Sequence, residues 1–433
     1  MTYEEALAYI AGLAPRGWRL GLDRMSEFAK RAGLEDSLGQ PGGPQFIHVA
    51  GTNGKGSVTA FVQSILTAAG YRTGGFFSPY VYDPRERVQY RCELIPEEDF
   101  AAITERLIPI ADSLADTELG EVTEFEFKTA LGLEYWKQME CQWVALEVGL
   151  GGRLDSTNIV TPRCSVITSI SLDHTAILGS SLAAIAREKA GIIKPGVPVV
   201  VGDLPEEAMC VVEQKADEQG SSLWRLGKAF ATADTKPWGL EAPLPGRRMA
   251  QNIFLSMAAI PAAGIKISFH DIQKGVASTL LPGRFERRTF GGIEAVFDGA
   301  HNSSAAASLA ETLRAEYPGR RKVLLTGMVA GHDPISFYQP LAELIDSAHI
   351  TPIDFHRAVP PDDLAAIVSR LIPRTSTHSC TRDALNHALR DCGGDALLLV
   401  TGSFYLLAEV AAEGSRTGRT EPTSYSERQS RRP

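Results

Sequence analysis

The chain has 433 residues, a length that suits two globular domains, each large enough to bury an apolar core. Apolar residues make up 44% of the sequence and charged residues 22%, close to the averages for globular proteins, which excludes a mainly disordered or fibrous chain. The net charge of -9 gives no overall attraction for nucleic-acid phosphates or anionic lipid, so we expect neither nucleic acid nor a membrane as a partner.

Cysteine spacing and the start of the chain bear on its location. The six cysteines are scattered without a CxxC pair, which favours free thiols in a reducing compartment over a zinc site or a disulfide framework. The start carries two acids, Glu4 and Glu5, where a signal peptide needs basic residues, and no apolar run is long enough to span a bilayer. We therefore expect a cytoplasmic protein.

The first expected strand, loop and helix surround a glycine loop. A short apolar run over 45–50 leads into Gly51-Thr52-Asn53-Gly54-Lys55-Gly56-Ser57, and apolar residues recur at helical spacing over 58–69. In this context backbone N–H groups and a helix N-terminus converge on phosphate, and Lys55 adds a positive charge. Gly56 follows the lysine, so the spacing differs from GxxxxGK[ST] and does not favour an ordinary P-loop kinase or GTPase. A glycine turn without a ligand is the alternative.

Polar side chains follow two of the next expected strands. Three further apolar runs lie at 143–148, 165–170 and 197–201. They predict buried strands of a largely parallel sheet. Glu147 lies near the end of the first run, and Asp173 and His174 follow the second, so we expect all three at one edge of the sheet, where Glu147 suits Mg²⁺. Structural, hydrogen-bonded roles for Glu147 and His174 remain the alternative.

Lys189 lies in the run Arg187 to Gly196, at the end of a predicted helix. Basic residues are common there because they favour the negative end of the helix dipole. From residue type alone, Lys189 is interpreted as a solvated charge.

A second alternation of strands and helices begins near residue 290. The expected strands cover 293–297, 322–328 and 396–401, and the expected helices cover 303–315 and 404–412. Proline and glycine at Leu281-Pro282-Gly283-Arg284 mark the boundary. We predict an α/β protein with a larger domain over 1–284 and a smaller α/β domain over 285–413. A tail over 414–433 lacks apolar periodicity and is predicted to be disordered.

Another polar cluster is expected near that boundary. Arg284 lies on it, and Asp298-Gly299-Ala300-His301-Asn302 follows a strand and precedes a helix. Phosphate and ribose contacts suit this cluster, and an arginine at a domain junction can stabilise charge on a transferring phosphoryl group. An ion pair that joins two domains is the alternative.

Taken in chain order, these motifs resemble the folylpolyglutamate synthase and dihydrofolate synthase family, a branch of the Mur ligase superfamily. The resemblance runs from about Tyr3 to Val410. Its further segments are Phe77-Ser78-Pro79, Arg85-Glu86-Arg87-Val88, Thr123-Glu124-Phe125-Glu126-Phe127, Ser171 to Gly179, Glu188 to Val200, Pro282-Gly283-Arg284 and Gly402-Ser403. It implies a Mur-ligase-like central domain that contains the phosphate loop, and a Rossmann-like C-terminal domain with glutamate-ligase activity.

The resemblance implies roles for individual residues. The residues implied to bind ATP are Gly51, Thr52, Asn53, Gly54, Lys55, Gly56, Ser57, Asn252, Arg284 and Asp298. The implied metal ligands are Ser78, Glu147, His174 and a carbamylated Lys189. The implied folate contacts are Pro79, Tyr80 and Phe125. The implied catalytic residues are Lys55, Lys189, Arg284, Asp298 and His301.

The implied reaction transfers the γ-phosphoryl group of ATP to a carboxylate of a folate or dihydropteroate, after which the amine of L-glutamate attacks the acyl phosphate. Two Mg²⁺ ions, Lys55 and Arg284 would neutralise the charge along the transfer path, and a monovalent cation is compatible with it. His301 or Asp298 would assist deprotonation of glutamate. We expect a monomer that acts on small molecules.

Several positions depart from the family's usual pattern. Tyr80 replaces a histidine, Arg248-Met249 replaces His-Gln, Ser303 replaces a proline, and Gly331-His332-Asp333 replaces Asp-Lys-Asp. These departures leave open whether the enzyme makes dihydrofolate, extends polyglutamate tails, or does both.

Two other functions were weighed. A Mur enzyme acting on a UDP-linked peptidoglycan precursor normally carries an extra N-terminal domain before its glycine loop, for which Lys55 leaves no room. A nucleotide-binding regulator without transfer chemistry has little need for the whole set of Lys55, Glu147, His174, Lys189 and Asp298.

Overall fold

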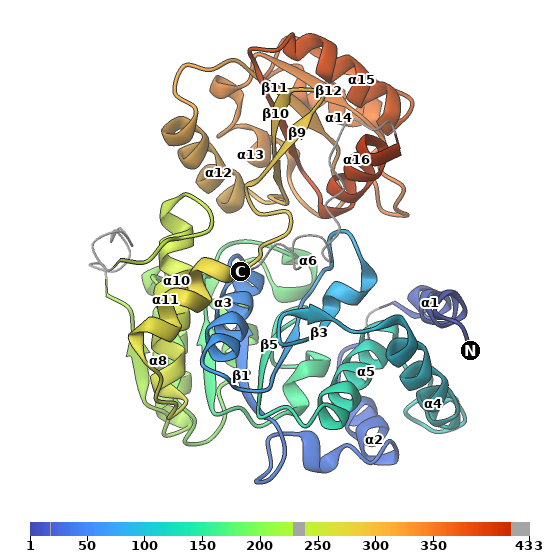
Figure 1. The fold of residues 1–433 in the computed structure, drawn as a ribbon, viewed down its shortest axis with the longest axis vertical. Coiled ribbons are helices and arrows are strands. Elements are labelled where there is room, and N and C mark those ends of the chain that lie inside the picture. Colours follow the sequence, from blue (N-terminus) through green and yellow to red (C-terminus); the bar gives the residue numbers. More distant parts are fainter. Residues whose placement is uncertain (18, 228–238, 417–433) are drawn as a thin grey trace. The chain divides into compact units, whose positions relative to one another are not determined.

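The computed structural model describes residues 1–17, 19–227 and 239–416. The chain divides into two compact units, coloured from blue to yellow and from yellow to red in Figure 1. Unit 1 comprises Met1–Pro243 and Arg247–Leu280, and unit 2 comprises Leu244–Gly246 and the chain from Leu281 onward. The tail expected over 414–433 lies outside the described residues from 417, and its first three residues belong to the last helix.

Unit 1 is built on an eight-stranded sheet with the order β4-β3-β2-β5-β1-β6-β7-β8 in the described residues. Its strands are β1 (Gln45–Ala50), β2 (Thr73–Phe76), β3 (Val88–Tyr90), β4 (Glu93–Leu94), β5 (Trp143–Glu147), β6 (Cys164–Ile167), β7 (Val199–Val201) and β8 (Leu223–Arg225). All neighbours pair in parallel except β2 with β3 and β3 with β4. The predicted parallel sheet is therefore confirmed, because strands buried on both faces have continuous apolar sequences.

Helices cover this sheet. The helices of unit 1 are α1 (Tyr3–Gly12), α2 (Asp23–Arg31), α3 (Lys55–Ala68), α4 (Glu97–Ala115), α5 (Glu124–Gln138), α6 (Thr175–Leu178), α7 (Leu182–Ala190), α8 (Glu206–Glu218), α10 (Arg247–Ala262) and α11 (Phe269–Ser278), with 3₁₀ turns η1 (Ala14–Arg16), η2 (Glu35–Ser37), η3 (Pro84–Arg87) and η4 (Ser156–Ile159). One apolar core joins α1, α2, α4 and α5 to Phe46 and Phe76 of the sheet. Helices α10 and α11 pack on α3, and a second core joins α7 and α8 to β6 and β7.

Unit 2 holds a six-stranded sheet with the order β13-β12-β11-β14-β10-β9 in the described residues. Its strands are β9 (Glu286–Phe290), β10 (Ile293–Asp298), β11 (Lys322–Thr326), β12 (Ser347–Ile350), β13 (Thr375–Thr377) and β14 (Leu397–Thr401). Only β9 pairs antiparallel among these strands. The mixed, mostly parallel sheet confirms the second α/β domain predicted from the alternating pattern.

The helices of unit 2 are α12 (Ser303–Glu316), α13 (Pro334–Tyr338), α14 (Pro361–Val368), α15 (Thr381–Cys392) and α16 (Phe404–Arg416), with the 3₁₀ turn η6 (Ala342–Leu344). Residues of α12, α13 and α14 share one core with β10, β11, β12 and β14. Helix α15 contacts β11 and β12, and α16 contacts β10 and β14.

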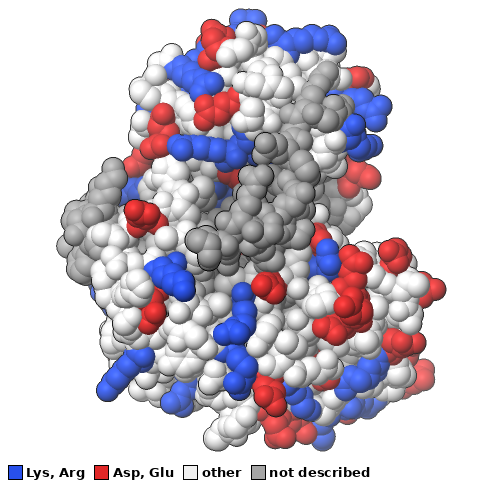
Figure 2. All heavy atoms as spheres, viewed as in Figure 1, with Lys and Arg blue, Asp and Glu red and all other residues white. Residues whose placement is uncertain are grey.

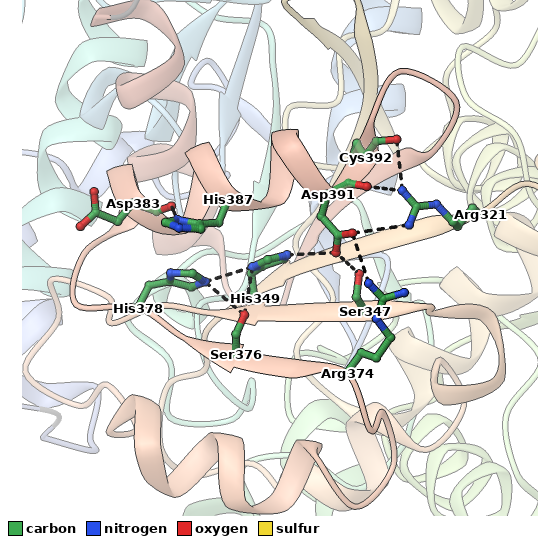
Figure 3. A network of polar contacts seen from close by, with 10 residues as sticks. All are labelled: Arg321, Ser347, His349, Arg374, Ser376, His378, Asp383, His387, Asp391 and Cys392. Carbon is green, nitrogen blue, oxygen red and sulfur yellow. Dashed lines mark hydrogen bonds and ion pairs between the residues drawn. The ribbon is translucent and has the colours of Figure 1, made fainter.

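A polar network joins β12, the end of β13 and α15 (Figure 3). His349 Nδ1 lies 3.0 Å from His378 Nε2, and His349 Nε2 lies 3.3 Å from Asp391 Oδ2. Arg321 and Arg374 form ion pairs with the same Asp391 carboxylate. Two imidazoles and one carboxylate therefore share a single network at this edge of the sheet.

The described surface and helices add two facts. On the face drawn in Figure 2, basic and acidic side chains are interspersed over the coloured residues. None of the described helices is long and apolar enough to cross a membrane.

Candidate active site

The glycine loop lies between β1 and α3, as predicted. Gly51 has φ +153° and Gly54 has φ +90°, values that favour glycine because a Cβ would be strained there. A Cβ on Gly51 would also stand 1.9 Å from Thr168 Oγ1. The helix begins at Lys55 instead of residue 58, since Gly54 turns the chain directly into its first turn. The first N–H groups of α3, which have no acceptor within the helix, therefore follow the loop directly and suit a phosphate.

Hydrogen bonds join the glycine loop to the segment that follows β6. Thr52 N donates to Ser169 O over 2.7 Å, and Asn53 N donates to Ser169 Oγ over 2.9 Å. Thr168 Oγ1 donates to Asn53 O over 2.7 Å, and Ser171 N donates to Thr52 Oγ1 over 3.1 Å. These bonds fix the backbone of the loop before any ligand binds, so little ordering entropy remains to oppose binding.

Lys189 lies against this loop. It sits near the end of α7, is 4% exposed, and its Nζ donates to Gly51 O over 2.8 Å. Burial, followed by the positive charge of Lys55, lowers the pKa of Lys189 to about 7, while Asp173 and Asp155 act in the opposite direction. The interpretation of Lys189 as a solvated charge, from residue type alone, is wrong because the helix end is packed against the loop.

Two other predicted nucleotide residues lie at the loop. Lys55 Nζ donates to Thr52 O over 3.2 Å, so its ammonium group stays beside the loop. Asn252 comes from α10, and its Oδ1 would be 2.6 Å from a Cβ on Gly54. Segments far apart in the sequence thus bring a lysine and an amide to one short turn.

Glu147 and Ser78 form the second part of the site. Glu147 ends β5, is 3% exposed, and its Oε2 accepts from Ser78 N over 2.9 Å. Val49 of β1 lies opposite Glu147 in the parallel register, so this carboxylate is beside the start of the glycine loop. A buried carboxylate oxygen near a phosphate loop is a ligand that Mg²⁺ accepts.

His174 and Asp173 follow β6, on the other side of β1. His174 Nε2 lies 3.9 Å from Asp173 Oδ1, and His174 is the residue before α6, with φ +48°. Among the described residues no three His, Cys, Asp or Glu side chains are placed to hold a metal ion. Glu147 and the pair Asp173 and His174 follow β5 and β6, which are separated by β1, so their strands lie two spacings, or about 10 Å, apart.

The residues implied to contact folate lie in an aromatic cluster that also contains two cations. Arg87 Cζ lies 5.9 Å from the ring centre of Tyr80 and 5.6 Å from that of Phe125. Lys128 Nζ also lies 5.9 Å from the Tyr80 ring centre and pairs with Glu124. Pro79, which precedes Tyr80, is exposed.

Arg87 and Lys128 were not predicted from the sequence as site residues. Arg87 was visible in the motif Arg85-Glu86-Arg87-Val88, but Lys128 lies one turn beyond Phe125 on α5 and carries no local signal. Burial, followed by the charge of Arg87, lowers the pKa of Lys128 to about 8. The two cations therefore share a poorly solvated environment beside the aromatic rings.

In unit 2 the predicted residues gather at the end of β10. Asp298 Oδ2 accepts from Phe285 N over 2.8 Å, and Asp298 Oδ1 accepts from Ala300 N over 2.9 Å. Desolvation raises the pKa of Asp298, although these N–H groups and the charge of Arg284 oppose the rise. His301 Nδ1 lies 2.8 Å from Gly299 O. A carbonyl only accepts, so Nδ1 carries the proton and Nε2 is the nitrogen that can accept one.

Known proteins match both units. The Mur ligase middle domain family matches residues 49–260, and the Mur ligase glutamate ligase domain family matches residues 283–404. The dihydrofolate synthase/folylpolyglutamate synthase of Bacillus subtilis is 32% identical, with 94% of this chain and 98% of the relative covered. The folylpolyglutamate synthase of Lacticaseibacillus casei is 31% identical, with 95% of this chain and 98% of the relative covered.

Solved structures agree with these relatives. Escherichia coli FolC in complex with DHPP and ADP aligns with a TM-score of 0.84 and 31% identity, covering 96% of this chain and 99% of that one. A bifunctional folylpolyglutamate synthase/dihydrofolate synthase with Mn, AMPPNP and L-glutamate bound aligns with a TM-score of 0.82 and 30% identity, covering 95% of this chain and 98% of that one.

The two α/β units, the phosphate loop and the two matching domain families define an ATP-dependent ligase of the Mur ligase type. Within that class, identity above 30% over nearly the whole length shows that the chain belongs to the folylpolyglutamate synthase/dihydrofolate synthase family.

Proposed function

We propose that this chain uses ATP to join L-glutamate to a folate, as a tetrahydrofolylpolyglutamate synthase, and that it also accepts dihydropteroate. The observation that carries the proposal is Lys189, which is buried and donates to Gly51 O of the phosphate loop over 2.8 Å. The names of the Bacillus subtilis and Escherichia coli relatives, which combine both activities, support the double specificity. We propose that the protein acts as a monomer in the cytoplasm on small-molecule substrates.

The glycine loop is the proposed site for the ATP phosphates. Gly51 to Ser57 supply backbone N–H groups and the N-terminus of α3, and Lys55 adds the positive charge that a transferring phosphoryl group needs. Asn252, held against Gly54, is the proposed contact from α10. The hydrogen bonds from Thr52 and Asn53 to the segment that follows β6 support a site that is preformed in the free protein.

Magnesium fits the donors beside this loop. Two Mg²⁺ ions are proposed, with Ser78, Glu147 and His174 as direct or water-mediated ligands; no residue is assigned to a monovalent cation. Since no three-residue His, Cys, Asp or Glu cluster exists in the described part of the chain, phosphate oxygens and water must complete the coordination. This is the usual arrangement for Mg²⁺ with a nucleotide, where it would polarise the phosphoryl oxygens.

Lys189 is proposed to carry a carbamate. Only a neutral amine attacks CO₂; the new N–C bond releases one proton and leaves a carboxylate on the nitrogen. The pKa of Lys189, lowered to about 7, makes about half of the side chains neutral at pH 7, against about one in three thousand for a lysine with the usual value of 10.5. Carbamylation would convert a buried cation into an oxygen ligand beside Gly51.

The proposed reaction has two steps. A carboxylate oxygen of the folate attacks the γ-phosphorus of ATP, the bond to the β,γ-bridging oxygen breaks, and ADP leaves, while Lys55 and Arg284 stabilise the charge. The amine of L-glutamate then attacks the acyl carbon, phosphate leaves, and the nitrogen loses a proton. We assign that proton to His301 Nε2, because both Asp298 oxygens already accept backbone N–H groups.

The aromatic cluster is the proposed folate site. Tyr80 and Phe125 offer ring faces, Pro79 is exposed beside them, and the cations Arg87 and Lys128 can attract an anionic substrate. Gly149, two residues after Glu147, supports a location near the metal ligands, because Phe125 Cζ would stand 2.4 Å from a Cβ there.

The test is ADP formation by the purified chain with dihydropteroate and with tetrahydrofolate, each with and without L-glutamate. We expect glutamate-dependent ADP release with tetrahydrofolate, and also with dihydropteroate. Release with a UDP-muramoyl peptide and with neither pteridine substrate would replace the folate function by that of a peptidoglycan ligase. Nucleotide binding without any turnover would support a regulator instead.

A further inference from the structure

Four side chains of unit 2 stand in contact one after another. Arg284 Cζ lies 4.2 Å from the ring centre of Phe404, within the range of a cation–π interaction. The ring centres of Phe404 and His301 lie 6.0 Å apart in an edge-to-face arrangement, and those of His301 and His332 lie 5.1 Å apart. We call Arg284, Phe404, His301 and His332 the ring stack.

The backbone holds Phe404 in place. It is the first residue of α16, directly follows Gly402-Ser403, and is 7% exposed. A Cβ on Gly299 would stand 2.0 Å from Phe404 Cε1, so the ring lies against the backbone of the loop that carries His301. Thr401, at the end of β14, pairs with Asp298 at the end of β10. The position of the ring is thus set by two adjacent strand ends.

Arg284 and His301 benefit from such a rigid neighbour. An arginine side chain has high rotamer freedom, and Arg284 Nη1 donates to Gly283 O over 3.4 Å. The ring face restricts where the guanidinium can point. His301 is fixed at Nδ1 by Gly299 O, and contact of its ring with Phe404 limits rotation about that bond.

We propose that Phe404 is a positioning residue that aligns the Arg284 guanidinium and the His301 imidazole for the ligase reaction, with His332 closing the stack. The proposal rests on the roles of Arg284 and His301 in the proposed function. The Phe404 ring carries no group that can transfer a proton or bind phosphate, so its effect passes through those two side chains. Misplacement of a catalytic group by about 1 Å can cost about 100-fold in rate.

The test compares Phe404→Leu, Phe404→Tyr and a control, Phe290→Leu, by steady-state ADP formation and thermal unfolding. Phe290 is fully buried in the same unit and stacks on Phe297 with ring centres 5.6 Å apart, away from the ring stack. We expect Phe404→Leu to lower kcat about 10- to 100-fold while KM for ATP and glutamate changes less than about 3-fold. Phe404→Tyr keeps the ring and should retain most of the activity, and Phe290→Leu should lower the melting temperature but not kcat.

Combination with Arg284→Lys decides whether Phe404 acts through the stack. Lysine keeps the charge but not the flat guanidinium, so Phe404→Leu should lower kcat by a smaller factor in this background than in the wild type, and the remaining loss acts through His301. Losses that multiply independently would overturn the proposal, as would an Arg284→Lys variant with wild-type kcat. Equal loss of kcat in Phe404→Leu and Phe290→Leu would also overturn it.

A second variant covers the case in which Phe404→Leu does not fold. His332→Ala removes the outer ring at a half-buried position and should lower kcat about 3-fold with an unchanged melting temperature. A kcat equal to that of the wild type would overturn the proposal that the ring stack positions Arg284 and His301. Failure of the proposed function can be told apart from failure of the Phe404 proposal, because in the former case the wild-type protein would release no ADP with any folate. In that case the affinity of the same variants for ADP would be measured in place of kcat, and we expect the variants to be affected in the same order.

Discussion

Replacement of Lys189 by methionine should make the protein more stable and inactive. A lysine whose folded-state pKa is about 7, against 10.5 when unfolded, prefers to be neutral in the fold. The lowered pKa costs no stability above pH 10.5; the cost grows as the pH falls and is complete below about pH 7. At pH 7.5 the lowered pKa therefore costs about 4 kcal/mol of stability, and at pH 10 about 1 kcal/mol.

Methionine fills a similar volume without a charge, but the hydrogen bond from Nζ to Gly51 O is lost, at about 1 kcal/mol. The expected gain in the free energy of unfolding is thus about 3 kcal/mol at pH 7.5 and close to zero at pH 10. The assay is urea unfolding of Lys189→Met and wild type at both pH values in buffer freed of CO₂. Turnover of the variant should fall more than about 100-fold.

Bicarbonate provides the internal control for this prediction. If Lys189 is carbamylated, bicarbonate should stabilise the wild-type protein and leave Lys189→Met unchanged, since methionine cannot react. A smaller variant, Lys189→Ala, should lose activity and regain part of it with short carboxylic acids. A stability difference that is absent at pH 7.5, or that does not shrink at pH 10, would refute the reasoning from burial.

Three further predictions concern other parts of the two units. Lys55→Ala should lower turnover more than about 100-fold with little change in melting temperature, because the half-buried ammonium group donates a hydrogen bond to the Thr52 carbonyl and makes no other among the described residues. Comparison of ADP release with a thermal melt tests this prediction. Gly299→Ala should destabilise unit 2 by about 1–3 kcal/mol, since the new Cβ would stand 2.0 Å from Phe404 Cε1, and an unaltered urea midpoint would contradict it. Burial lowers the pKa of His349, so the stability that depends on its neutral form is present above pH 6.5 and is lost as the pH falls. His349→Gln should therefore lose less stability than the wild type between pH 7 and pH 5, and parallel curves of unfolding free energy against pH would argue against it.

The local features of this protein could be predicted from the sequence. The run over 45–50 became β1 with the same bounds, and the runs over 143–148 and 293–297 became β5 and β10 within one residue. A buried parallel strand needs a continuous apolar sequence, and the positive φ values of Gly51 and Gly54 favour glycine. The strands and the loop can therefore be predicted from short runs of neighbouring residues. The glycine loop between β1 and α3 was predictable for the same reason.

Contacts between distant segments were decided by the tertiary structure alone. From its residue type, Lys189 was predicted to be a solvated charge. The packing of α7 against the glycine loop buries its side chain, and this burial lowers its pKa. Lys128 meets Tyr80, and Phe404 meets Arg284, through contacts that no local pattern records. Desolvation and ring contacts depend on which segments the fold brings together, whereas strand and loop patterns depend on neighbouring residues. The sequence by itself thus determined the two α/β units and the glycine loop, and the tertiary structure decided the burial and the contacts of the side chains around them.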